Sequence, residues 1–358
     1  MDEPSVRGQS AGFINNGSTS RPRTLRALLR QCRALLAWVH RAVGPREMKI
    51  HTDITAFHGV QRPVLTTGTF DGVHLGHQVI LDRLRTVARR EGGESVLFTF
   101  HPHPRLVLFP NDNDLRLLNT PAEKQHLLEK AGLDHLLVVP FSREFSRMLA
   151  ADYVRNVLVG GIGVHALVIG YDHRFGRNRE GDIDLLRRIA ADSGFLVEEI
   201  PAQEIDHVKV SSTKIREALM AGDAARANAL LGYPYMLSGV VVKGRQLGRT
   251  IGWPTANVGA IDPNKLIPGN GVYAITATTG RGQFKGMMNI GVRPTVEQHG
   301  ERTVEAHLFG LEGEIYGEAI TVRLHHRLRD ELRFDGMEAM KDRIALDKVD
   351  ALRALEKV

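Results

Sequence analysis

Short apolar runs alternate with segments of helical periodicity over residues 48–231. A short run rich in β-branched side chains is typical of a buried strand, whereas apolar residues spaced three and four apart indicate a helix with one buried face. The predicted strands lie at 63–67, 95–100, 136–140, 165–170 and 195–200, and the predicted helices at 75–91, 123–130, 152–159, 185–194 and 211–219. Strands and helices that alternate in this way predict an α/β fold with a doubly wound sheet.

The pattern changes near residues 221–234, where we place the joint between two domains. Helical periodicity stops there, and short β-rich runs separated by Gly and Pro predict a small antiparallel barrel or sandwich. These runs lie at 235–242, 271–278, 286–290, 303–309 and 319–324, and a closing helix is predicted from Met337 to the C-terminus. The predicted domains are therefore 48–231 and 232–358, preceded by a segment of residues 1–47.

The segment 1–47 differs in composition from the rest of the chain. Residues 1–20 are rich in Ser, Gly and Asn and are expected to be disordered, and residues 25–43 fit a short basic amphipathic helix. Arg-rich, acid-poor sequence of this kind resembles an organellar transit peptide. We favour an extension outside the folded domains, with Met48 opening the functional protein. A basic tether for nucleic acid or a membrane surface is a third interpretation, and salt-sensitive binding would be its signature.

The overall composition is that of a globular protein. Its 358 residues suffice for two domains, 42% of them are hydrophobic, and no apolar run approaches the length of a membrane span. The single cysteine, Cys32, cannot form an internal disulfide, which fits a reducing compartment, and we expect a cytoplasmic protein. Five of the six net positive charges lie in residues 1–47, so net charge does not indicate a nucleic-acid partner, although a local patch remains open.

The stretch Gly68–His77 joins a predicted strand to a predicted helix. Its glycines allow the backbone to approach a ligand, and the unpaired N–H groups of the first helical turn favour phosphate. His74 and His77 lie three residues apart, so both imidazoles project from one face and can stabilise charge on a phosphoryl group. The alternative is that both histidines only cap or pack the helix. We favour a nucleotide site.

Three further segments of this domain offer ligands. His103 lies in a Pro-fixed loop after the strand 95–100, where contact with a ligand and a purely structural role are equally compatible with the sequence. The loop 170–182 follows another strand and carries several arginines that can pair with phosphate, unless it is a solvated charged turn. Ser211, Ser212 and Thr213 open a helix with Arg216 one turn later, which favours a second phosphate-binding helix terminus over capping alone.

In the β-rich domain, Gly248–Asn257 is the informative stretch. Gly248 and Gly252 give a flexible loop that can wrap around phosphate, and Thr255 and Asn257 supply oxygen ligands of the kind that Mg²⁺ accepts. A Pro-Thr-Ala-Asn turn without a ligand is the alternative. Glu305 lies between apolar residues of a predicted strand, where it is either an outward-facing side chain or a carboxylate with a chemical role.

These segments, in this order and spacing, resemble the prokaryotic bifunctional riboflavin kinase/FAD synthetase family from about Met48 to Val358. The resemblance implies a Rossmann-like nucleotidyltransferase domain followed by a six-stranded antiparallel barrel. In the first domain it implies His74 and His77 as catalytic residues, an ATP and phosphate site, and a flavin-side or phosphate loop. The ATP and phosphate site is Gly68, Phe70, Asp71, Gly72, Ser211, Ser212, Thr213 and Arg216, and the loop site is His103, Asp172, Arg174, Phe175 and Gly176.

In the second domain the resemblance also includes the segments 289–295, 304–307 and 327–334. It implies that Glu305 is the general base for the ribityl hydroxyl of riboflavin. It further implies an ATP site, two flavin-side arginines and Mg²⁺ brought with ATP. The ATP site is Gly248, Gly252, Pro254, Thr255 and Asn257, with Thr255 and Asn257 also as metal ligands, and the arginines are Arg329 and Arg333.

The expected function is therefore the phosphorylation of riboflavin to FMN and the adenylylation of FMN to FAD, both with ATP. No nucleic-acid or membrane partner is expected, and self-association is left open. A nucleotidyltransferase with another acceptor, such as a phospho-alcohol, is the nearest alternative, but such enzymes lack a kinase-like β domain. A regulator that binds flavin or nucleotide without catalysis is another class, and release of pyrophosphate would exclude it.

Overall fold

The structure is a computed structural model that describes residues 47–111, 115–202, 204, 210–244, 248, 252–292 and 302–358. The predictions for the N-terminal segment, including its helix at 25–43, lie outside the described residues. In the part of the chain that the structure describes, no helix is long and apolar enough to cross a membrane.

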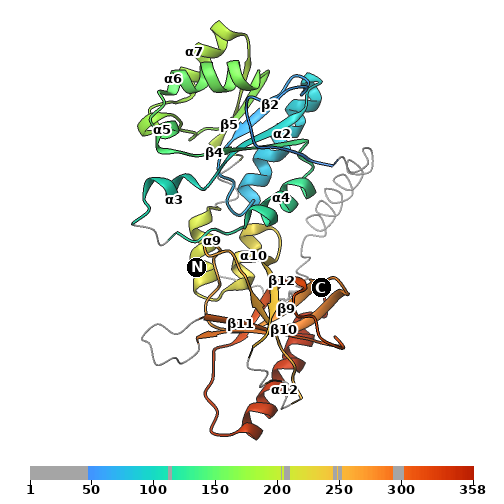
Figure 1. The fold of residues 1–358 in the computed structure, drawn as a ribbon. Helices are drawn as coiled ribbons and strands as arrows, with labels where there is room; N and C mark the ends of the chain where they lie inside the picture. The colour runs from blue at the N-terminus through green and yellow to red at the C-terminus, as the bar shows by residue number, and fades with distance from the viewer. Residues whose placement is uncertain are drawn as a thin grey trace, which may run out of the picture. The chain divides into compact units, whose positions relative to one another are not determined.

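A six-stranded parallel sheet forms the centre of the first domain (Figure 1). Its strand order is β1-β4-β3-β2-β5-β6, and every neighbouring pair is parallel. The chain runs outward from β2 to β3 and β4, then returns to the other side of β2 for β5 and β6. The order therefore reverses between β2 and β5, the place where open α/β sheets bind ligands. The strands are β1 (Lys49–His51), β2 (Val64–Thr67), β3 (Ser95–His101), β4 (His135–Pro140), β5 (Ala166–Gly170) and β6 (Leu196–Ile200).

Helices connect the strands and bury apolar residues on the sheet in two hydrophobic clusters. The longest, α2 (Leu75–Glu91), ends at Gly92 in the left-handed conformation, and α4 (Pro121–Lys130) begins with the capping box of Thr120 and Glu123. The others are α3 (Pro104–Leu108), α5 (Arg143–Ser146), α6 (Ala150–Asp152), a 3₁₀ turn (Arg177–Arg179), α7 (Ile183–Ser193), α9 (Ser212–Met220) and α10 (Ala224–Leu231).

The short elements β1, α3, α5 and the 3₁₀ turn were not predicted from the sequence. Two longer regions of the first domain also differ from the predictions. The helix expected at 152–159 begins at Ala150 as α6 and continues as a π-helix (Tyr153–Ile162), which ends at Gly163 in the left-handed conformation. A wider winding changes the spacing of its buried residues, so periodicity of 3.6 located the helix but not its end. The expected joint at 221–234 contains α10, which Asp223 caps and whose buried alanines are too small to give a strong apolar pattern.

The second domain is a closed antiparallel barrel with the order β10-β11-β8-β7-β12-β9. The strands are β7 (Tyr235–Val242), β8 (Ala256–Gly259), β9 (Gly271–Thr279), β10 (Gly282–Val292), β11 (Arg302–Leu308) and β12 (Ala319–Arg329). The run-by-run pattern missed β8, which has only four residues, but the six-stranded barrel implied by the family resemblance is confirmed.

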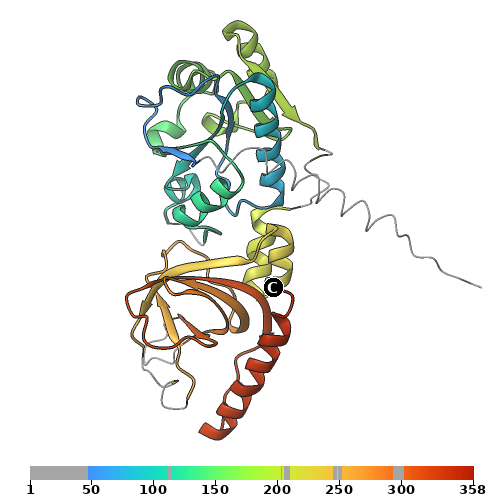
Figure 2. The same cartoon turned by 90° about the vertical axis from the view of Figure 1, so that its right-hand side faces the viewer.

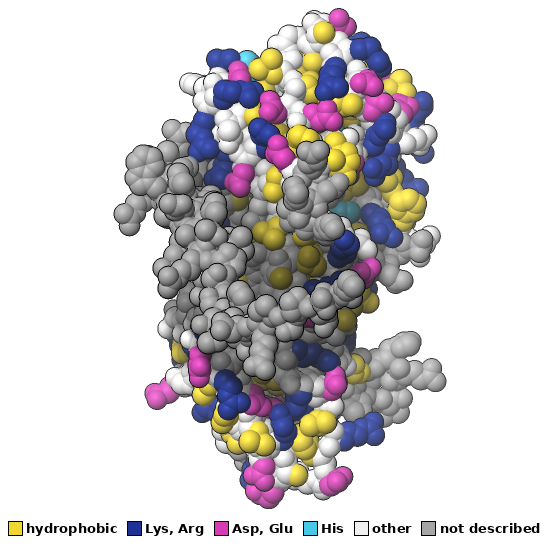
Figure 3. All heavy atoms as spheres, turned by 180° about the vertical axis from the view of Figure 1, so that it is seen from behind, with side chains coloured by type: hydrophobic (Ala, Val, Ile, Leu, Met, Phe, Trp, Pro, Cys, Tyr) yellow, Lys and Arg dark blue, Asp and Glu magenta, His cyan; other side chains and the backbone are white. Residues whose placement is uncertain are grey.

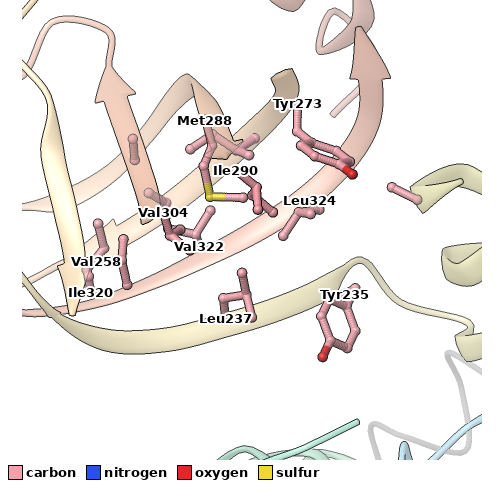
Figure 4. Packing of buried hydrophobic residues seen from close by; sticks show 14 of the residues in the cluster. Tyr235, Leu237, Val258, Tyr273, Met288, Ile290, Val304, Ile320, Val322 and Leu324 are labelled. Atoms are coloured by element: carbon pink, nitrogen blue, oxygen red, sulfur yellow. The ribbon is translucent and has the colours of Figure 1, made fainter. Parts of the chain in front are cut away.

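The barrel interior is filled by apolar side chains from all six strands, including Leu237, Val258, Ile290, Val304 and Val322 (Figure 4). Helix α12 (Met337–Ala354) follows the last strand and runs along the outside of the barrel (Figure 2). Ala351 and Leu355 pack there against Val272, Ala274 and Met287. The two faces of each strand therefore serve different purposes, since the inner face builds the core and the outer face is left for helix packing and for polar side chains.

Candidate active sites

The turn Gly68–His77 follows β2 at the point where the strand order reverses. Its backbone is unusual, because Phe70, Gly72 and Val73 all have positive φ angles, of 47°, 92° and 34°. A side chain at Gly72 would place its Cβ 2.7 Å from Leu118 Cδ1, so glycine is required for conformation and for space. We call this turn, together with the N-termini of α2 and α9, the cradle.

The two histidines of the cradle stack on each other, with ring centroids 3.6 Å apart, and Phe70 stacks on His77. His74 is the N-cap of α2, and its Nδ1 accepts a hydrogen bond from His77 N–H at 3.3 Å. The capping role left open by the sequence is therefore real for His74. Since Nδ1 accepts, the proton of neutral His74 is on Nε2, which is the atom left to donate.

Burial controls the charge of both imidazoles. It lowers the pKa of His74 to about 4, and burial together with the neighbouring His74 lowers the pKa of His77 well below its usual value. Both rings are neutral at pH 7 and act as hydrogen-bonding groups rather than as cations. His77 Nδ1 is buried without a hydrogen-bond partner. Because buried polar atoms almost always have a hydrogen-bond partner, this unsatisfied nitrogen makes the turn a candidate ligand site.

Asp71 connects the cradle to the second predicted helix terminus. Its buried carboxylate pairs with Arg216 of α9, and Ser212 Oγ donates to the Asp71 carbonyl oxygen at 2.9 Å. Ser211 caps α9 by accepting from Lys214 N–H at 3.3 Å, whereas Thr213 is exposed. The structure thus brings together two helix N-termini that lie about 140 residues apart, as the hydrogen bond between residues 212 and 71 shows.

The sequence patterns did not single out Lys124 and Tyr233, which also hold the cradle. Lys124 Nζ donates to Thr69 O at 2.7 Å, and Tyr233 Oη donates to Gly72 O at 2.5 Å. The signal for Lys124 was available, because the capping box fixes the start of α4 and therefore the face on which Lys124 lies. No local signal existed for Tyr233, which reaches the turn only through the tertiary fold.

His103 is the N-cap of α3, and its Nδ1 accepts from Arg105 N–H at 3.2 Å. Burial lowers its pKa to about 4, and Asp71, Lys124 and Arg216 are close enough to act on that pKa electrostatically. His103 therefore has the structural role and also lies near the charged residues of the cradle.

The loop 170–182 has a more structural character than its composition indicates. Phe175 is packed into the core, with 8% of its surface exposed. Its ring stacks on that of His173 and is tilted against that of Tyr153. Gly176 has a φ of 74°, and a Cβ there would lie 2.6 Å from Ala150 Cα. Arg174 pairs with Asp182 at 3.3 Å, and Asp172 is exposed. Contact of these residues with flavin or phosphate stays a prediction.

On the barrel, strand register aligns three polar residues. Asn257 of β8 is opposite Glu305 of β11, and Glu305 is opposite Asn289 of β10. Val304 and Ala306 on either side of Glu305 are buried in the barrel core, so the alternation of β11 places Glu305 on the outer face. Sequence reasoning quoted the segment of Asn289 but did not select this residue. We call Asn257, Glu305 and Asn289 the polar row.

The loop before β8 approaches this row closely. A Cβ at Gly248 would lie 2.2 Å from Trp253 O and 3.4 Å from Thr255 Oγ1, and one at Gly244 would lie 2.3 Å from Asn257 Nδ2. His307 Nδ1 donates to Pro254 O at 2.7 Å and fixes the loop to β11. Gly252 is exposed with a φ of 84°, and the predicted segments at 249–251 and 293–295 lie outside the described residues. A hydroxyl oxygen and a side-chain amide oxygen are ligands of the kind that a hard divalent cation accepts.

The two predicted flavin-side arginines have different environments. Arg329 forms a bidentate ion pair with buried Asp347 of α12, with Nη2 2.7 Å from Oδ2. Arg343 pairs with the same carboxylate, so this cluster fastens α12 to β12. Arg333 is exposed. A role of either arginine at the flavin stays a prediction.

Comparison with known proteins shows which families the two domains match. Residues 58–214 match the family model described as FAD synthetase, and residues 231–355 match that of riboflavin kinase. A bifunctional riboflavin kinase/FMN adenylyltransferase from Pseudomonas fluorescens is 40% identical over 292 residues, which is 82% of this chain and 92% of the relative. The chain belongs to the bifunctional riboflavin kinase/FMN adenylyltransferase family. The member from Escherichia coli (strain K12) is 38% identical, over 80% of this chain and 91% of that relative. The member from Bacillus subtilis (strain 168) is 36% identical, over 82% of this chain and 92% of that relative.

A solved structure with the same fold is described as a macrolide-efflux protein from Streptococcus pneumoniae. It superposes with a TM-score of 0.76 at 29% identity and covers 84% of this chain and 97% of that chain. The architecture of a parallel sheet followed by a closed barrel is thus shared over nearly the whole length of that protein.

Charged residues of both signs are interspersed on the face shown in Figure 3. In the described part of the chain, no group of three or more His, Cys, Asp or Glu side chains could hold a metal ion. A metal bound at either site would therefore depend on other oxygen ligands, including those of a nucleotide.

Proposed function

We propose that this chain phosphorylates riboflavin to FMN with ATP and then adenylylates FMN to FAD. The supporting observation is that one chain carries two candidate sites, one for each reaction. The cradle lies in the region matched by FAD synthetase, and the polar row lies in the region matched by riboflavin kinase. The domain limits 48–231 and 232–358 belong to the same proposal.

The polar row supports the kinase reaction. The ribityl hydroxyl oxygen attacks the γ-phosphorus of ATP. The bond from that phosphorus to the oxygen that bridges the β- and γ-phosphorus atoms breaks, and ADP leaves. Glu305 accepts the hydroxyl proton as general base. Asn257 and Asn289 are its neighbours across the strands and can orient the hydroxyl and the phosphate by hydrogen bonds. Arg329 and Arg333 are assigned to the flavin side.

ATP-dependent kinase and nucleotidyltransferase domains generally need a divalent metal, and we assign Mg²⁺ to that role. Thr255 Oγ1 and the Asn257 side-chain oxygen would hold it in the kinase site together with nucleotide phosphates. When bound, the ion neutralises part of the phosphate charge. The close approach of Gly244 to Asn257 and of Gly248 to Thr255 leaves no room for a side chain that would compete for these ligands.

The cradle supports the second reaction. An oxygen of the FMN phosphate attacks the α-phosphorus of ATP, and pyrophosphate leaves. The attacking phosphate is ionised at neutral pH, so positioning and charge stabilisation carry this step without a protein base. His74 and His77 donate to the transferred phosphoryl group as neutral imidazoles, and the N-termini of α2 and α9 with Ser212, Thr213 and Arg216 hold the triphosphate.

The same proposal sets the partners and the compartment. ATP, riboflavin, FMN and FAD are the small-molecule partners, nucleic acid and membranes are not, and the reactions take place in the cytoplasm. On the face shown in Figure 3, charges of both signs are interspersed among the coloured side chains, which supports this assignment for that face. Self-association is tested by sedimentation of the full chain.

The deciding experiment is chromatography of riboflavin after incubation with Mg-ATP and the purified full-length chain. FMN should appear first and FAD later, with one pyrophosphate released for each FAD. FMN without FAD would remove the adenylyltransferase half of the proposal. If neither product forms, while flavin and ATP still bind, the chain is a flavin- or nucleotide-binding regulator instead.

A further inference from the structure

A lysine of the barrel is buried against the first domain. Lys265 lies between β8 and β9, its side chain is 0% exposed, and its ammonium group has two oxygen partners from the segment before and within α4. Nζ donates to Leu118 O at 2.6 Å and pairs with Glu123 Oε2 at 2.6 Å, and it lies 4.3 Å from the centre of the Tyr235 ring. A buried charge costs free energy unless it is paired and hydrogen-bonded. Because separating Lys265 from either partner would incur that cost, the lysine holds both partners in fixed positions.

The first partner leads directly to the cradle. Leu118 offers its carbonyl oxygen to Lys265, and its N–H donates to Asp71 Oδ1 at 2.9 Å. Asp71 in turn pairs with Arg216 of the second helix terminus. The backbone here is also paired with the barrel, because Leu117 N–H donates to Asn264 O at 2.6 Å. One residue therefore joins the barrel lysine to the carboxylate that connects α2 and α9.

The second partner leads to the cradle by another route. Glu123 Oε2 accepts from Thr120 N–H in the capping box, and Oε1 accepts from Ser238 N–H of β7 at 3.0 Å. Lys265 and β7 thus fix the first turn of α4. The next residue, Lys124, donates to Thr69 O in the cradle. The contact at Asp71 is therefore made by a residue that Lys265 contacts, and the contact at Thr69 is made by Lys124, which directly follows the second partner of Lys265 in the chain.

We propose that Lys265, although it belongs to the kinase barrel, is a positioning residue for adenylyl transfer. It fixes Leu118 and α4, and through them the distance between Asp71, Arg216 and the phosphate-binding turn. This inference rests on the proposed function of the cradle. Displacement of reacting groups by about 1 Å can cost on the order of 100-fold in rate, so loss of this lysine should act on the second reaction without touching its substrates.

The test measures both activities in the full-length chain with Lys265→Met. Adenylylation of FMN should fall about 10- to 100-fold in kcat, with a change in the KM for ATP of about threefold or less. Riboflavin phosphorylation should stay within about twofold. Lys265→Met leaves the Glu123 carboxylate buried and unpaired, which by itself destabilises the fold.

A second variant separates position from stability. In Lys265→Met/Glu123→Gln the unpaired buried charge is gone, so the unfolding midpoint should recover relative to the single variant. The contact with Leu118 O is still missing, so adenylylation should stay low. Lys285→Met is the matched control, since Lys285 is a barrel lysine that donates to a backbone carbonyl, Leu355 O, at the α12 end of the chain. It should leave adenylylation unchanged.

Two results would overturn the inference. One is adenylylation that recovers together with stability in the double variant, and the other is a loss of adenylylation in proportion to the loss of kinase activity in either variant. Failure of the proposed function looks different, because the unmodified chain would then form no FAD from FMN and ATP.

Discussion

The two candidate sites differ in how the fold assembles them. The polar row lies on three hydrogen-bonded strands of one barrel, so strand register alone aligns Asn257, Glu305 and Asn289. The cradle is held by contacts from residues far apart in the chain, including Lys124 and Tyr233. The polar row, which strand pairing aligns, should tolerate changes elsewhere in the molecule. The cradle, which several distant segments hold, should depend on each of those segments.

The largest effect is expected for Glu305→Gln. Removing the proposed general base should lower riboflavin phosphorylation by about 10²- to 10⁴-fold, because the hydroxyl proton then has no acceptor in the polar row. Adenylylation of supplied FMN should be unchanged. Product formation from riboflavin and from FMN, measured separately, checks both halves. Equal loss of both activities would show that the two sites are not separate.

The next largest effect is expected for His77→Asn, which tests the cradle. It removes one proposed donor to the transferred phosphoryl group, and FAD formation should fall by about 10²- to 10³-fold. Phosphorylation of riboflavin should continue, so FMN should accumulate in a mixture of riboflavin and Mg-ATP. His126→Asn, an exposed histidine of α4, is the control and should change neither activity. Unchanged FAD output from His77→Asn would contradict the catalytic assignment of that imidazole.

A smaller effect is expected for Tyr233→Phe, which tests whether the cradle depends on a residue that is distant in the sequence. The change leaves Gly72 O without its donor, and an unsatisfied buried group costs about 1–3 kcal/mol. Since 1.36 kcal/mol in a barrier is tenfold in rate, adenylylation should fall by about tenfold if most of that cost appears in the transition state. Phosphorylation should be unaffected although Tyr233 lies at the start of the kinase region. Steady-state rates of both reactions, with thermal unfolding as the stability control, test this.

The smallest effect concerns acid stability. Burial lowers the pKa of His74, His103, His173 and His325 to about 4. Because these groups stay neutral in the folded protein while the unfolded chain binds protons near pH 6.5, their contribution to stability is complete above pH 6.5 and is lost as the pH falls toward 4. The loss should be on the order of 1 kcal/mol per histidine between pH 7 and 5.

Three of these four histidines lie in the adenylyltransferase region. Acidification to pH 5 should therefore weaken that region first, and FAD-forming activity should be lost before FMN-forming activity when samples are returned to pH 7.5. His325→Gln should reduce the pH dependence of the unfolding midpoint slightly. Simultaneous loss of the two activities would contradict an uneven distribution of acid sensitivity.

Much of the fold was predictable because its elements have strong local signals. The strand before Gly68, the helix predicted at 123–130 and the strand at 235–242 all appear in the structure where the sequence placed them. The histidine pair and Glu305 could also be selected from sequence, since polar residues of that kind beside apolar runs need an explanation.

The rest depended on tertiary contacts that leave no local pattern. Strand β8 is short, and its partners are known only once the barrel closes. Asn289 is a candidate site residue only because of its register with Glu305. Lys265 has no sequence signal for burial, and its role follows only from its contacts with Leu118 and Glu123. Phe175 shows the opposite case, because a loop rich in charge concealed a residue of the core.

The closed barrel and the open parallel sheet also differ at their borders. A barrel leaves no edge strand, whereas the parallel sheet of the described residues ends at β1 and β6, whose outer edges could pair with another chain. Strand β6 carries Glu198 and Glu199, which pair with Arg83, Arg90 and Arg187, and these charges discourage such extension. Removal of these charges should therefore make β6 of the parallel sheet the first place at which two molecules associate. The closed barrel offers no comparable edge strand.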